Sequence, residues 1–203
     1  GVIRVNELQD AHAACQRIGR IVQNQPALTA EEKYTLLLEH YIPGSEIAVE
    51  GMLGPEGFEL LCIFDKPDAL EGPYFEETYY ITPSRLDPPT QQKVRQLISD
   101  CCRAYGLRQG AVHAECRINK QGIWLLEIAA RTIGGMCAKL FELGSGISLE
   151  KRVLSNALGC SLPRIKLEAA LGVLMIPTPK AGVLKSITGL QSARQIPFVS
   201  DLE

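Results

Sequence analysis

The sequence contains no long hydrophobic run, no block of basic residues and no recognisable targeting segment. No apolar stretch approaches the roughly 20 residues that a membrane-spanning helix needs. The formal net charge is −2 over 203 residues, which argues against a nucleic-acid partner or an anionic membrane surface. Residues 1–5 lead straight into a polar segment, so we expect no signal peptide.

Common metal-binding and nucleophile motifs are also absent. The seven cysteines form no CxxC pair, and most lie in apolar stretches, which is typical of reduced core residues in a cytoplasmic protein. The three histidines are scattered, and His113 and Cys116 would point to opposite faces of a strand, so a zinc site is not expected. No serine or cysteine has the context of a nucleophile elbow.

The sequence does contain enough apolar material for a sizeable core, with 46% hydrophobic and 22% charged residues. Helical spacing predicts a helix from a cap at Asn6, with Gln9 in the reciprocal position, to about Gln25. A second helix is predicted between Asp87 and Gly106, and helical segments are predicted from 136 to about 158. Strands are predicted at 2–5, 34–42, 45–52, 60–64, 79–82, 111–118, 123–131, 171–176 and 182–187. Short helices mixed with antiparallel hairpins favour an α+β fold.

The most informative feature is a pair of acids, Glu115 and Glu127, in two apolar-rich runs joined by a short turn. The stretch 120–122, Lys-Gln-Gly, fits a three-residue hairpin loop with glycine in the left-handed position. Asn119 then pairs with Ile123, and Glu115 lies directly opposite Glu127. Directly opposed side chains have Cβ atoms about 4.5–5.5 Å apart, and like charges there repel.

Two carboxylates in this arrangement suit a hard cation such as Mg²⁺, which commonly takes one or two carboxylates plus substrate phosphates. Arg131 lies on the same face, roughly 13 Å further along at about 3.3 Å per residue, near enough to meet a ligand of the metal. The alternative is a solvated hairpin with unrelated surface acids. A four-residue loop would place the acids on opposite faces and remove the argument.

The sequence resembles the C-terminal part of an ATP-grasp carboxylate–amine ligase of the L-amino-acid (dipeptide) ligase branch. The resemblance rests on LLLEHYIPGSEIAVEG, FDKPDALEGPYFEETYYITPS, AVHAECRINKQGIWLLEIAARTIGG and MIPTPKAGVLKSITG, in family order and at family spacing. It implies an ATP-grasp catalytic subdomain, an antiparallel sheet with helices, at 43–166. The rear part of the lid and the hinge would occupy 1–42, and a small C-terminal β-containing module 167–203.

The resemblance also implies how ATP is bound. Glu39 and Ile42 would hold adenine in the hinge, Glu39 towards the exocyclic amine and Ile42 through its backbone N–H. Glu46 would accept hydrogen bonds from the ribose hydroxyls. The alternative interpretation of these residues is a strand end with a surface acid.

Glu115 and Glu127 correspond in this resemblance to the family's metal ligands, for Mg²⁺ or alternatively Mn²⁺. Arg131 corresponds to the arginine that stabilises charge on the transferring phosphoryl group and the acyl phosphate, and it would also contact substrate. Ala129 stands where many ATP-grasp enzymes have asparagine, as in the amino-acid ligase branch. Any third metal contact must therefore come from elsewhere.

The loop at 75–78, Phe-Glu-Glu-Thr, resembles the ligase segment that faces the amino-acid substrate, and Glu77 is assigned to the substrate ammonium group. Tyr80 stands where some relatives have histidine, a departure that bears on side-chain specificity. Lys66 is a candidate for neutralising phosphate, although an exposed lysine is the more ordinary interpretation.

The implied activity is activation of an amino-acid carboxylate as an acyl phosphate and its coupling to an amine, with release of ADP and phosphate. Complete enzymes of this type also have a preceding domain and a lid with two lysines and a glycine-rich loop. Because GVIRVNELQDA resembles the lid after that loop, we expect a fragment that turns over little without its N-terminal part. The alternatives are a carboxylase- or nucleotide-biosynthesis-type ATP-grasp enzyme, and a non-catalytic binding or regulatory module.

Overall fold

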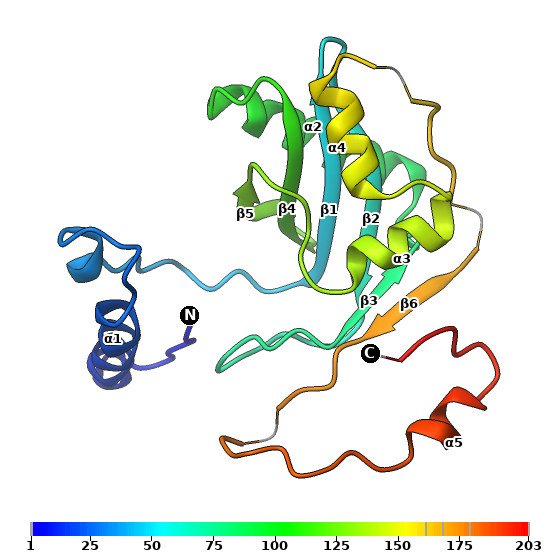
Figure 1. Ribbon diagram of the computed structural model, residues 1–203. Coiled ribbons are helices and arrows are strands. Elements are labelled where there is room, and N and C mark those ends of the chain that lie inside the picture. Colours follow the sequence, from blue (N-terminus) through cyan, green and yellow to red (C-terminus); the bar gives the residue numbers. More distant parts are fainter. Residues whose placement is uncertain (1, 161, 168, 179, 203) are drawn as a thin grey trace.

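The computed structural model describes residues 2–160, 162–167, 169–178 and 180–202. Its centre is a six-stranded sheet with the order β5-β4-β1-β2-β3-β6, in which neighbouring strands are antiparallel. Helices α3 and α4 lie across one face, and α2 lies behind the other (Figure 1). The α+β architecture predicted from the sequence is therefore confirmed.

The strands are β1 (Ser45–Gly54), β2 (Gly57–Lys66), β3 (Tyr79–Thr82), β4 (Gly110–Asn119), β5 (Gly122–Ala129) and β6 (Leu171–Leu174). The helices are α1 (Leu8–Gln23), the 3-10 turn η1 (Glu32–Tyr34), α2 (Pro88–Ala104), α3 (Cys137–Ser145), α4 (Leu149–Ala157) and α5 (Leu190–Arg194).

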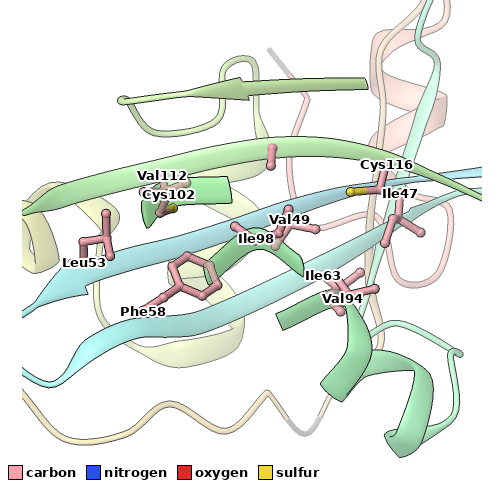
Figure 2. Close-up of a cluster of buried hydrophobic side chains, with 11 residues drawn as sticks. Ile47, Val49, Leu53, Phe58, Ile63, Val94, Ile98, Cys102, Val112 and Cys116 are labelled. Atoms are coloured by element: carbon pink, nitrogen blue, oxygen red, sulfur yellow. The ribbon is translucent and has the colours of Figure 1, made fainter. Parts of the chain in front are cut away.

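The first core lies between the sheet and α2 (Figure 2). The Asp87 carboxylate accepts the backbone N–H of Thr90 at 2.9 Å and so caps α2, whose first turn carries the predicted prolines. The apolar stripe of α2 then packs on alternate residues of β1 and β4. This core comprises Ile47, Val49, Leu53, Phe58, Ile63, Val94, Ile98, Cys102, Val112, Ala114 and Cys116.

A second core covers the opposite face, under α3 and α4, and includes Ala48 and Met52 of β1 together with Phe64, Phe141 and Leu149. Because β1 is buried on both faces, it is largely apolar instead of alternating. The polar residues of a strand buried on both faces require a specific explanation, because an unpaired charge is costly there.

The β4–β5 hairpin turns over two residues and not over the three that we predicted, because Asn119 pairs with Gly122. The side chain of Asn119 accepts the backbone N–H of Gln121 at 2.9 Å and so stabilises the turn. Gly122 has φ 147°, a conformation that side-chain-bearing residues rarely adopt.

A two-residue loop by itself would set Glu115 opposite Leu126. The ladder has an irregularity between Glu115 and Cys116, which absorbs Leu126 as the extra residue of a β-bulge. Glu115 therefore pairs with Glu127, as predicted, although the loop length in that prediction was wrong.

The predicted buried strand at 34–42 is wrong. After η1 the chain runs extended, and Tyr34, Leu37 and Leu38 are 80%, 81% and 82% exposed. The strands that flank β1 are β2 and β4, so no described strand pairs with this segment. An apolar run predicts burial, but an extended segment becomes a strand only when a neighbour satisfies its backbone groups.

Residues 2–5 and 182–187, all of them described, also form no strand, contrary to the prediction, whereas β6 confirms most of 171–176. Helix α1 ends within two residues of its predicted end, but its cap differs. Glu7 is the N-cap without a side-chain hydrogen bond, and the Asn6 amide oxygen instead accepts the Arg4 guanidinium at 3.1 Å. No helix among the described residues is long and apolar enough to cross a membrane.

The N-terminal segment contacts the loop between β2 and β3, although α1 itself lies apart from the sheet (Figure 1). The backbone N–H of Arg4 donates to the Pro73 carbonyl at 2.9 Å, and its guanidinium lies 3.8 Å from the centre of the Tyr41 ring. Tyr41 stacks on Phe75 with ring centres 6.3 Å apart. These contacts join the segment before β1 to the loop predicted to face substrate.

Candidate functional site

A group of six acidic and basic residues of β1, β2 and β4 lies on the sheet face that α3 and α4 partly cover. On β1 and β4 the residues between the apolar positions packed on α2 point to this opposite face. The register pairs Glu46 with Arg117 and Glu50 with His113 across β1 and β4. Glu46 also pairs with Lys66 across β1 and β2. These residues are Glu46 and Glu50 of β1, Lys66 of β2, and His113, Glu115 and Arg117 of β4.

Lys66 is buried and binds three carboxylates. Its ammonium group donates to Glu46 and to Glu115 at 2.9 Å each, and also to Glu77 of the β2–β3 loop. Burial disfavours the charged form, but Glu115 and Glu46 outweigh burial and raise the pKa of Lys66 above its ordinary value. The expectation of an exposed lysine is therefore wrong, because its position at the end of β2 points it onto the polar face.

Arg117 is the second buried cation of this face and was not singled out from the sequence. Its Nε donates to Glu46 at 2.8 Å, and its Nη1 donates to the Ile42 carbonyl at 2.7 Å. Its Nη2 donates to the Leu70 carbonyl. Strand alternation from Glu115 was the available signal, since it places Arg117 on the same face.

The candidate nucleotide residues have different environments. Glu46 is buried, and its two oxygens accept from Lys66 and Arg117 respectively. The carbonyl of Ile42 is bound by Arg117, while Glu39 is exposed in the extended segment before β1. The structure thus connects Ile42 with Glu46 through Arg117 and leaves the side chain of Glu39 in solvent.

Glu115 and Glu127 are paired across β4 and β5, but their side chains have different contacts. The Glu115 side chain is 20% exposed and pairs with Lys66, whereas the Glu127 side chain is 56% exposed and lies 3.6 Å from Arg131. Burial would raise the pKa of Glu115, but His113 and Lys66 outweigh burial and lower it to about 2. Glu115 is thus an ionised carboxylate at neutral pH.

Three carboxylates of this face have the donor atoms that a divalent cation takes, although the Lys66 ammonium lies among them. Glu46, Glu77 and Glu115 each offer a carboxylate oxygen, and these atoms lie within 4.8 Å of one another. Oxygen donors of this kind are preferred by Mg²⁺. The ammonium of Lys66 contacts all three, so this point of the face already attracts positive charge. Among the described residues, Glu127 is not part of this group of three carboxylates. It is paired with one member of the group, Glu115, across β4 and β5.

A further buried pair, Glu50 and His113, lies next to Glu115. His113 Nδ1 is 3.6 Å from a Glu50 oxygen, and its Nε2 is 3.7 Å from a Glu115 oxygen. Burial alone would lower the pKa of His113, but the two carboxylates outweigh burial and raise it to about 9. Burial raises the pKa of Glu50, with His113 acting against it.

Glu77 and Tyr80 occupy the side of the site formed by the β2–β3 loop and β3. Glu77 binds Lys66 and retains a 35% exposed side chain. Burial and the neighbouring Glu77 carboxylate raise the pKa of Tyr80, and its ring centre lies 5.2 Å from the Lys66 ammonium. Tyr80, which stands where some relatives were expected to have histidine, therefore stays a neutral phenol.

The chain belongs to the ATP-grasp family, because the family's ATP-grasp domain matches residues 1–139. Among curated proteins it is similar to the alanine–anticapsin ligase of Bacillus subtilis, with 27% identity over 150 residues, 66% of this chain and 31% of that protein. It is also 26% identical over 171 residues to the uncharacterized protein y4rH of Sinorhizobium fredii, across 83% of this chain and 34% of that protein.

Among solved structures, the L-amino acid ligase from Bacillus licheniformis has a TM-score of 0.83 and 28% identity, over 96% of this chain and 49% of that one. Biotin carboxylase from Campylobacter jejuni has a TM-score of 0.62 at 21% identity, over 83% and 37%, and shares the fold alone. The chain thus spans about half the length of the ligase structure and about a third of the curated relatives. The resemblance to L-amino-acid ligases is confirmed.

Proposed function

We propose that the protein carrying this chain is an ATP-dependent carboxylate–amine ligase acting on amino acids. The similarity to an L-amino acid ligase along 96% of the chain supports the class. The observation that carries the proposal is the pairing of Glu115 with Glu127 across β4 and β5, beside a buried Lys66. Such a face combines acidic metal ligands with fixed positive charge.

In the proposed reaction, a substrate carboxylate oxygen attacks the γ-phosphorus of ATP, and ADP leaves. The resulting acyl phosphate is attacked at its acyl carbon by an amine, which loses a proton as the amide forms and phosphate departs. Positioning and charge stabilisation are the main contributions of a protein to such phosphoryl transfers.

Glu115 and Glu127 would hold Mg²⁺, or alternatively Mn²⁺, which when bound neutralises phosphate charge. Arg131, exposed and 3.6 Å from Glu127, would stabilise charge on the transferring phosphoryl group. Lys66 would add positive charge from its fixed place among the acids. This role explains why so many charges are kept on a face that is otherwise apolar.

The substrate and nucleotide assignments are part of the same proposal. Glu77 would bind the substrate ammonium group, because its carboxylate is partly exposed while Lys66 holds it in place. Glu39 and Ile42 would contact adenine, and Glu46 would contact the ribose through lone pairs that Lys66 and Arg117 leave free. We also propose a division into lid and hinge (1–42), catalytic subdomain (43–166) and C-terminal module (167–203). Activity would require the ligase residues that this chain does not span, and the location would be cytoplasmic.

The test uses the protein at its natural length with ATP, Mg²⁺ and pairs of amino acids, and measures ADP release together with peptide products by mass spectrometry. We expect ADP release that requires both amino acids. Glu127→Gln should lower turnover on the order of 100-fold or more, since a metal ligand is lost. Glu56→Gln, an exposed acid in the β1–β2 turn far from the site, should leave turnover unchanged.

Other outcomes identify the alternatives. ADP release that depends on bicarbonate, without an amide product, would indicate a carboxylase-type enzyme. Absence of ADP release under every condition, with ATP still bound, would indicate a binding or regulatory module. Unchanged turnover and metal dependence in Glu127→Gln would remove that residue from the metal site.

A further inference from the structure

The buried pair Glu50 and His113 has no role in the reaction described above. Glu50 is fully buried and His113 is 4% exposed, on adjacent positions of β1 and β4. Both lie on the same sheet face as Glu115, and Ala48 and Met52 of that face are part of the apolar core. A carboxylate in such surroundings costs several kcal/mol unless other groups compensate it.

The contacts of this pair reach two separate parts of the proposed site. One oxygen of Glu50 accepts the backbone N–H of Ile133 at 3.0 Å, in the segment that follows β5 and carries Arg131. The same oxygen lies 3.6 Å from His113 Nδ1, and His113 Nε2 lies 3.7 Å from Glu115. Glu50 and His113 therefore join the Arg131 segment to the carboxylate of Glu115.

The pair is not arranged for stability alone. The other Glu50 oxygen and His113 Nδ1 are buried without a hydrogen-bond partner among the described residues. Buried polar groups are nearly always hydrogen-bonded, and replacing a buried ion pair by well-packed apolar side chains is often neutral or stabilising. A buried pair that costs stability and contacts two segments of the proposed site is typical of residues that hold such a site in position.

We propose that Glu50 and His113 are positioning residues: Glu50 fixes the segment carrying Arg131, and His113 fixes the carboxylate of Glu115. This inference rests on the proposed function, because Glu115 and Arg131 have their roles there. Residues that contact the metal ligands, but not the metal itself, orient those ligands. Their loss typically lowers metal affinity or activity 10- to 100-fold. Neither residue would touch the substrate.

The first test compares two substitutions that each keep one half of the histidine contacts. In His113→Gln the side-chain amide reaches the place of Nε2, so it keeps a donor next to Glu115. In His113→Asn it reaches only the place of Nδ1, next to Glu50. Binding of Mn²⁺ in the presence of ADP is measured by calorimetry on the natural-length protein, with thermal unfolding as the control for folding.

We expect His113→Asn to weaken Mn²⁺ binding about 10-fold or more, and His113→Gln to restore much of that loss at a similar unfolding temperature. Equal affinities in the two variants, whether both match the wild type or both are reduced, would overturn the role of His113. Glu127→Gln is measured alongside. If it leaves Mn²⁺ affinity unchanged, the metal site of the proposed function fails, and the second test then decides the positioning claim.

The second test needs no metal. Glu50→Gln keeps an oxygen that can accept the Ile133 N–H, whereas Glu50→Ala removes it. Hydrogen exchange of residues 130–136 should be about 10-fold faster in Glu50→Ala and close to wild type in Glu50→Gln, because exchange follows local opening. An Ile133 amide that exchanges at the same rate in all three proteins would show that Glu50 does not hold this segment.

Discussion

The sheet with α2, α3 and α4 and the two segments that flank it are built differently. Between 45 and 157 two cores cover both faces of the sheet. In contrast, α1, which the structure describes throughout, contains no buried residue, and Leu37 before β1 is 81% exposed. Towards the C-terminus Ile176 and Phe198 are similarly exposed.

The residues of the proposed site accordingly fall into two groups. Glu46, Lys66, Glu115 and their neighbours are held by the sheet, so their geometry is set by strand register. Glu39 lies in the exposed segment, where no core fixes its position. We therefore infer that the acidic and cationic groups are preorganised by the sheet, while the nucleotide contacts depend on how the flanking segments are held.

The largest effect is expected for a phenylalanine of the sheet, Phe64, and the matched control is Phe198 in a flanking segment. Phe64 is 0% exposed in the sheet and Phe198 is fully exposed. Phe64→Ala should lower the free energy of unfolding by about 3–5 kcal/mol, because it removes core contacts and leaves a cavity. Phe198→Ala should change it by less than about 0.5 kcal/mol. Denaturant unfolding measures both, and similar losses in the two variants would contradict the division.

A smaller effect is expected where the two regions are joined. Arg117→Met leaves the carbonyls of Ile42 and Leu70 without their donor and Glu46 with one cation. The loss should be on the order of 3 kcal/mol, as for a broken buried ion pair. Arg103→Met, which removes an exposed pair with Asp100, should cost less than about 1 kcal/mol. Equal losses in unfolding experiments would mean that Arg117 does not tie the segments to the sheet.

The mildest probe is labelling of thiols in the native protein. Cys15 in α1 and Cys160 after α4 are exposed, whereas burial raises the pKa values of Cys62, Cys116 and Cys137 to about 12. Because the thiolate is the reactive form, a disulfide reagent at pH 8 should modify Cys15 and Cys160 first. Peptide mapping by mass spectrometry identifies the labelled sites. Early labelling of Cys116 would show that the sheet opens as readily as the flanks.

Much of the central sheet could be predicted because its strands carry strong patterns. The apolar runs of β1 and β2, the turn residues of the β4–β5 hairpin and the prolines that open α2 all correspond to observed elements. The segment 34–42 does not follow its local pattern. Its leucines have the composition of a buried strand, but burial depends on a partner that local sequence does not specify.

The candidate site was predictable only in part. The pairing of Glu115 with Glu127 was predicted with the wrong loop length, and the bulge at Leu126 that produces the pairing was not predicted. The buried state of Lys66 and the contact of Glu50 with His113 depend on the pairing of β1 with β4, and β4 is distant in the sequence from β1 and β2. A charged residue near a strand end is usually solvated, so composition alone favours the wrong answer for Lys66.

The most direct test is a crystal structure of the natural-length protein with Mn²⁺ and ADP, with the metal located by its anomalous scattering. We expect one ion bound by oxygens of both Glu115 and Glu127, at about 2.0–2.1 Å as for small octahedral cations. An ion held by Glu46, Glu77 and Glu115 with Glu127 turned away to solvent would contradict it.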